Sequence, residues 1–130
     1  MTGLVVVTHA GLATSLIAAA TMITGSSSGC EAVELHADDP ADGLVARIAE
    51  ALKTVGTDGA IIMTDMFGGT PSNAAMSFLQ EGKVEVVTGV NLPMMVEFFS
   101  RRERMTLEAL SASLFRCGRE RVIITADFLK

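Results

Sequence analysis

Two side chains that could carry proton or phosphoryl chemistry each follow an apolar run. His9 comes after residues 4–8, and Asp65 comes after residues 61–64. A carboxylate that accepts an N–H from one ring nitrogen of a histidine fixes the tautomer and leaves the other nitrogen free as a nucleophile. The carboxylate also stabilises the ring when it becomes cationic or phosphorylated. If the fold brings these two side chains together, the pair suits transient phosphohistidine chemistry.

The segment after Asp65 has the composition of an anion-binding turn. Two glycines precede Thr70 and Pro71, and we expect Pro71 to open a helix with Thr70 as its cap, because proline lacks an N–H that would be unpaired there. The free N–H groups of a helix N-terminus attract phosphate. The residues predicted to hold phosphoryl oxygens are Thr8, Gly68, Gly69, Thr70 and Ser72. The chain has no G-x-x-x-x-G-K-[ST] motif, so direct use of ATP is not expected.

The composition indicates one globular domain and narrows the class of partner. Apolar residues make up 49% of the 130 residues, which is enough for a packed core. A net charge of -5 without a basic cluster argues against nucleic acid as a partner. No apolar run approaches the roughly 20 residues of a membrane span, and no signal segment precedes the first strand. We therefore expect a cytoplasmic protein whose two cysteines, Cys30 and Cys117, are reduced thiols.

Apolar runs alternate with segments of helical periodicity along the whole chain. The expected strands are residues 3–8, 31–36, 59–64, 84–88 and 121–125. Amphipathic helices are expected at about residues 12–24, 44–55, 71–81, 93–101 and 107–117. This alternation predicts a single α/β domain over residues 1–130, with an open, doubly wound, mainly parallel sheet and helices on both faces.

The order of the strands decides which chemical groups meet. A doubly wound chain runs one way from its first strand and then returns past it, which predicts the order 2-1-3-4 for the first four strands. The first and third strands are then neighbours, and His9 and Asp65 lie at their carboxyl ends. Ligands bind in such folds at this switch point.

Two alternative hypotheses use the same edge of the sheet. His36 ends the second expected strand, so His9, Asp65 and His36 are a candidate ligand set for a metal-dependent hydrolase. Against this hypothesis, the second and third strands lie on opposite sides of the first, and no carboxylate cluster is evident. The other alternative is a flavodoxin-like anion-binding module, which the absence of Trp and Tyr weakens. We expect no metal and no cofactor.

Three motifs together carry a family resemblance. They are VTHAG at residues 7–11, DMFGGTPSN at residues 65–73 and GVNLPM at residues 89–94. In this order, and with the length and element order of nearly the whole chain, they resemble the mannose-family EIIA domain of the bacterial phosphoenolpyruvate-dependent sugar phosphotransferase system (PTS). The second motif is specific and the third fairly specific, whereas THAG alone would be weak.

The resemblance implies a phosphocarrier that serves sugar uptake or regulatory signalling. His9 would accept a phosphoryl group from phospho-HPr at its Nε2 atom and pass it to a separate IIB component, while Asp65 would orient the ring. The resemblance also implies a homodimer in which the fifth strand, residues 121–125, is exchanged and runs antiparallel. An exposed apolar strand of this kind would otherwise be a liability. The apolar residues expected to dock the partner proteins are Met66, Phe67, Leu92 and Met94.

Overall fold

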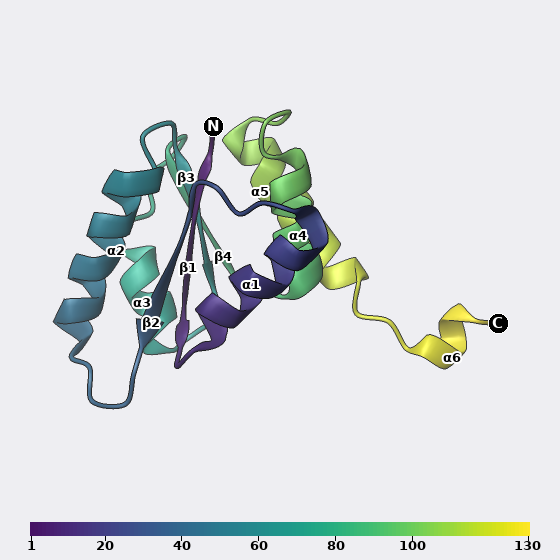
Figure 1. The fold of residues 1–130 in the computed structure, drawn as a ribbon, viewed down its shortest axis with the longest axis horizontal. Helices are drawn as coiled ribbons and strands as arrows, with labels where there is room; N and C mark the ends of the chain where they lie inside the picture. Colours follow the sequence, from purple (N-terminus) through teal and green to yellow (C-terminus); the bar gives the residue numbers. More distant parts are fainter.

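A four-stranded parallel sheet forms the centre of the computed structural model, which describes residues 1–130 (Figure 1). The strand order is β2-β1-β3-β4, which confirms the predicted order. The strands are β1 (Gly3–His9), β2 (Cys30–Leu35), β3 (Ala60–Thr64) and β4 (Val84–Thr88). Because β1 and β3 are paired in the middle of the sheet, the residues that follow them share one edge.

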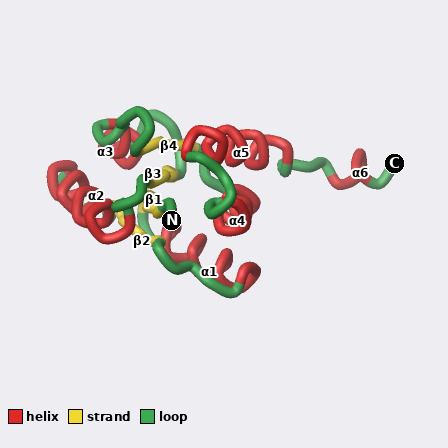
Figure 2. The backbone as a smooth tube through the Cα atoms, turned by 90° about the horizontal axis from the view of Figure 1, so that it is seen from above, coloured by secondary structure: helices red, strands yellow, loops and turns green.

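Six helices connect or follow the strands. They are α1 (Leu12–Thr24), α2 (Ala41–Val55), α3 (Thr70–Met76), α4 (Leu92–Arg101), α5 (Leu107–Glu120) and α6 (Thr125–Phe128). Figure 2 shows α2 and α3 on one side of the sheet and α1, α4 and α5 on the other. None of these helices has the length and apolar character needed to cross a bilayer.

Side chains of the central strands alternate between two buried apolar cores, as the pleat of a strand requires. Leu4 and Val6 of β1 pack with residues of α1, α4 and α5, whereas Val5 and Val7 pack with residues of α2 and α3. This alternation continues to the end of β1. Thr8 therefore points toward the α1 side of the sheet, and the next side chain along the strand points toward α2 and α3.

Two element boundaries differ from the prediction in ways that affect the site. β2 ends at Leu35, so His36 lies in the following loop. α3 ends at Met76 rather than near Gly82, because the chain tightens into a turn in which Phe78 N–H donates to the carbonyl of Ala75 at 3.0 Å. Leu79, which falls within the range expected for this helix, lies beyond its end and is 54% exposed.

The predicted fifth strand is not formed in the single chain. Residues 121–124 have no regular structure and no strand partner, and the segment leaves the body of the molecule before the short helix α6 (Figure 1). A strand requires a neighbour for its backbone N–H and C=O groups, and the end of α5 directs these residues away from the sheet. We call residues 121–130 the C-terminal tail. Its exposed large apolar side chains are Val122, Ile123, Ile124, Phe128 and Leu129.

Candidate functional site

The pairing of β1 with β3 brings His9 and Asp65 into direct contact. Val7 lies opposite Thr64 in the strand register, so the residues that follow meet at the sheet edge. Asp65 Oδ2 lies 2.8 Å from the ring Nδ1 of His9 and accepts the backbone N–H of His9 at 2.9 Å. Asp65 Oδ1 accepts the backbone N–H of Met66 at 3.0 Å. The predicted contact between the two side chains is confirmed, and hydrogen bonds hold both oxygens of the carboxylate.

The electrostatics of the pair favour a charged carboxylate beside an accessible ring. Partial burial raises the pKa of Asp65, but hydrogen bonds from the backbone and ring of His9 outweigh it and hold the pKa below its usual range. The side chain of Asp65 is 12% exposed, whereas that of His9 is 47% exposed. With Nδ1 donating its proton to Asp65, Nε2 keeps its lone pair and lies on the accessible part of the ring.

The turn between Asp65 and α3 lies against the imidazole. Gly68 has a φ of 90°, a conformation that disfavours any residue with a side chain. A Cβ atom built on Gly69 would lie 3.1 Å from Cε1 and 3.5 Å from Nε2 of His9, so the missing side chain leaves room beside the free nitrogen. Gly69 is the N-cap of α3 and no side chain caps this helix, so the predicted capping role of Thr70 is wrong.

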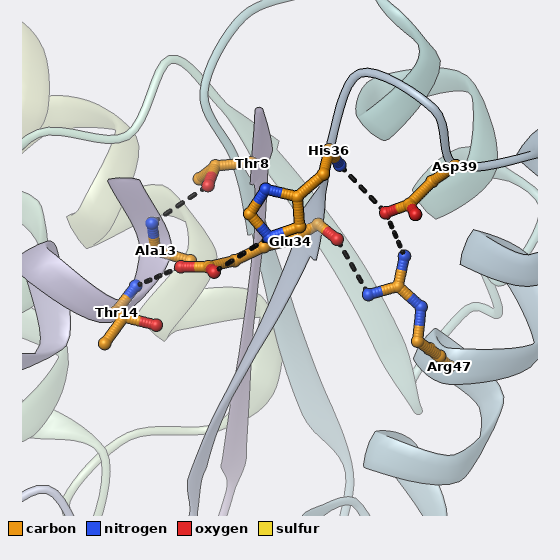
Figure 3. A network of polar contacts seen from close by, with 7 residues as sticks. All are labelled: Thr8, Ala13, Thr14, Glu34, His36, Asp39 and Arg47. Atoms are coloured by element: carbon orange, nitrogen blue, oxygen red, sulfur yellow. Dashed lines mark hydrogen bonds and ion pairs between the residues drawn. The ribbon is translucent and has the colours of Figure 1, made fainter. Parts of the chain in front are cut away.

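At the same edge of the sheet, two side chains accept N–H groups at the N-terminus of α1. Thr8 Oγ1 accepts the N–H of Ala13 at 2.9 Å, and Glu34 Oε2 accepts the N–H of Thr14 at 3.1 Å (Figure 3). Thr8 is fully buried, so its hydroxyl supports α1 and does not reach the exposed ring. Sequence reasoning missed Glu34, although an acidic residue at an α1-facing position of the second strand was a detectable signal.

Ser72 and Thr70 have different surroundings. Thr70 is exposed and lines an open depression of about 620 Å³ together with His9. Ser72 is fully buried, and its hydroxyl has no hydrogen-bond partner. Of the predicted supporting residues, the structure therefore places Gly69 beside the ring, Thr70 on the same depression and Gly68 in the same turn, whereas the side chains of Thr8 and Ser72 are buried.

His36 belongs to a separate network of polar contacts (Figure 3). Its Nε2 lies 3.5 Å from Glu34 Oε1, and its backbone N–H donates to Asp39 Oδ2 at 2.9 Å. Arg47 completes the network by donating to the Glu34 carbonyl at 2.7 Å and to Asp39 Oδ2 at 3.3 Å. Hydrogen bonds from Thr14 lower the pKa of Glu34.

No three His, Cys, Asp or Glu side chains form a metal-ligand group, so His9, Asp65 and His36 do not assemble the set that the hydrolase hypothesis requires.

Comparison with known proteins identifies the family. A family model described as "PTS system fructose IIA component" (EIIA-man) matches residues 3–115. The chain belongs to the mannose-type EIIA family of the PTS. It is accordingly a phosphocarrier component of that sugar-transport system, and the resemblance of the three motifs is confirmed. This family implies HPr and a IIB component as partners.

Relatives and solved structures agree with this assignment. The chain is 28% identical to the fructose-specific EIIA component of Bacillus subtilis (strain 168), covering 100% of this chain and 90% of the relative. It is 30% identical to the mannose-specific EIIAB component of Escherichia coli (strain K12), covering 92% of this chain but 38% of that longer protein. A mannose/sorbose-specific IIA subunit from Enterococcus faecalis is 28% identical and superimposes with a TM-score of 0.85, covering 95% of this chain and 93% of the subunit.

The apolar residues predicted to dock partners of this EIIA domain do not form one surface. Met66 is 59% exposed and Phe67 is 75% exposed, and both lie in the turn beside His9. Met94 is only 4% exposed and belongs to the core between the sheet and α1, α4 and α5, so it is not available to a partner. Leu92 is half-buried against the same core. The prediction is wrong for Met94, because α4 turns its side chain inward, whereas the docking role of Leu92 stays a prediction.

The space beside the His9 ring can be tested by filling it with a methyl group at position 69. We expect Gly69→Ala to slow phosphorylation of this EIIA domain about tenfold, because the new methyl group obstructs the approach to Nε2. The matched control is Gly11→Ala, whose Cβ would lie no closer than 4.0 Å to another atom, from Glu34 Oε2. The measurement is the rate of mass increase during incubation with phospho-HPr. Equal rates for Gly69→Ala and the wild type would show that this space is not used.

Proposed function

We propose that His9 is the phosphoryl acceptor of this EIIA domain, working in the cytoplasm between phospho-HPr and a separate IIB component. The observation that carries the proposal is the 2.8 Å contact between His9 Nδ1 and Asp65 Oδ2, which directs the lone pair of Nε2 outward. The Nε2 lone pair attacks the phosphorus atom, the N–P bond of the donor histidine breaks, and its electrons return to the donor ring. Transfer of the phosphoryl group from His9 to the IIB component uses the same geometry in the opposite direction.

Asp65 and the turn at Gly69 supply different parts of the catalysis. The carboxylate holds the Nδ1 proton and stabilises the positive charge that the ring acquires as the N–P bond forms. Backbone N–H groups near the start of α3, which no side chain caps, are the donors available to the phosphoryl oxygens. Transfer between similar phosphohistidines needs little driving force, so positioning and anion stabilisation account for most of the rate.

The exposure of the ring supports a protein rather than a small molecule as the phosphoryl donor. His9 is 47% exposed at the rim of an open depression, so the histidine of another protein can approach Nε2 in line. A deep pocket would prevent such an approach.

Intact mass spectrometry after incubation with phosphoenolpyruvate, enzyme I and HPr tests the acceptor role. We expect the wild type to gain one phosphoryl group and His9→Ala to gain none while keeping its fold. Asp65→Ala should react about 100-fold more slowly, because the ring loses its orienting carboxylate. Phosphorylation of His9→Ala at the wild-type level, or no reaction of the wild type with HPr fully phosphorylated, would contradict the proposal.

We also propose that Met66 and Phe67 form the apolar contact with both partner proteins. Large exposed apolar side chains next to a reactive group are frequent centres of binding energy. Phe67→Ala should raise the KM for phospho-HPr by about fivefold or more and leave kcat nearly unchanged. The control is Met22→Ala, since Met22 is 88% exposed near the far end of α1. A KM unchanged by Phe67→Ala would remove this residue from the interface.

Finally, we propose a homodimer in which residues 121–125 of each chain add to the sheet of the other chain. The apolar side chains of the C-terminal tail are exposed in the single chain, and β4 is an edge strand whose outer side is bridged only at Val84, by Gln80. Sedimentation should give twice the chain mass for the wild type and a lower mass for Ile124→Lys. The control Val45→Lys changes a 37% exposed residue of α2 and should stay dimeric. A monomeric wild type would refute the proposal.

A further inference from the structure

The side chain of Asn91 makes two hydrogen bonds with different purposes. Its Oδ1 accepts the backbone N–H of Met94 at 3.0 Å, which caps the N-terminus of α4. Its Nδ2 donates to the carbonyl of Gly118 near the end of α5 at 2.9 Å. Serine or aspartate would cap α4 equally well. The bond to Gly118 therefore needs a separate explanation, because it requires the amide group that only asparagine supplies among the common caps.

The two segments joined by Asn91 are also closely packed. A Cβ atom on Gly118 would lie 2.7 Å from Cε of Met94, so a side chain at this position would displace the flexible end of Met94. The thiol of Cys117 lies 3.7 Å from the carbonyl oxygen of Pro93. We call the contacts of residues 91–94 with residues 117–118 the α4–α5 clamp.

The clamp is continuous with the strand that carries Asp65. The backbone N–H groups of Gly89 and Val90 both donate to the carbonyl of Thr64, at 2.9 and 3.0 Å. The hydroxyls of Thr64 and Thr88 are hydrogen bonded at 3.0 Å. The loop that leads into Asn91 is thus held on Thr64, the last residue of β3, and Asp65 is the next residue of the chain. A shift of this loop would move the backbone from which the Asp65 carboxylate reaches His9.

We propose that Asn91 is a positioning residue for phosphoryl transfer, which acts through the α4–α5 clamp and Thr64 to hold Asp65 against the ring of His9. The inference rests on the proposed acceptor role of His9. Asn91 itself does not touch the reacting atoms. Its amide donor fixes the loop against α5, and its carbonyl oxygen performs the independent task of capping α4.

Substitution by serine separates these two tasks. Asn91→Ser keeps an oxygen that can cap α4 but removes the donor to Gly118, so we expect transfer from phospho-HPr at saturating donor to slow about three- to tenfold with KM unchanged. The control Thr106→Ala removes the oxygen that accepts the Ala109 N–H at 3.2 Å and caps α5, a cap outside the clamp. It should lower Tm and leave the transfer rate unchanged.

A spectroscopic readout distinguishes positioning from a general loss of stability. The long-range ¹H–¹⁵N spectrum of the His9 imidazole reports the tautomer that Asp65 selects. We expect a mixed tautomer signal in Asn91→Ser and the wild-type signal in Thr106→Ala. A wild-type transfer rate in Asn91→Ser, or equal slowing in Thr106→Ala, would overturn the inference. Failure of the wild type to accept a phosphoryl group would instead refute the proposed function.

Discussion

The site depends on one oxygen of Asp65, which accepts two N–H groups of His9. The backbone bond at 2.9 Å fixes where the histidine leaves β1, and the ring lies 2.8 Å from the same oxygen. Both contacts depend on the pairing of β1 with β3 in register, which the β2-β1-β3-β4 order provides. The topology of the whole sheet is thus a condition for one hydrogen-bonded pair.

The elements around this pair divide structural from chemical tasks. On the α1 side, Thr8 and Glu34 accept the N–H groups of Ala13 and Thr14, so that helix N-terminus is part of the scaffold. On the α3 side, no side chain caps the helix, and Gly69 leaves space beside the ring. Under the proposed function, the backbone donors available to a phosphoryl group on Nε2 are therefore those of the α3 side. This asymmetry follows from the pleat of β1, which turns Thr8 and His9 to opposite faces.

The sequence was sufficient for features set by local periodicity and insufficient for those set by packing. Alternation of apolar strands and amphipathic helices predicted the strand order and the meeting of His9 with Asp65. The burial of Ser72 and Met94 depends on how α3 and α4 are rotated against the sheet, which spacing alone does not determine. The fifth strand could not form in one chain because residues 121–125 have no neighbour there. Glu34 was overlooked because its role arises from contact with a helix twenty residues away in the sequence.

The open rim around His9 has a kinetic consequence for the cycle of this carrier. Under the proposed function, a single face of the His9 ring must meet the protein that gives the phosphoryl group and, later, the protein that removes it. The two complexes cannot form at the same time, so a complex that does not dissociate after transfer prevents the next complex from forming. Flux is therefore greatest when each complex is weak and dissociates quickly. An excess of spent donor acts as a competitive inhibitor of delivery.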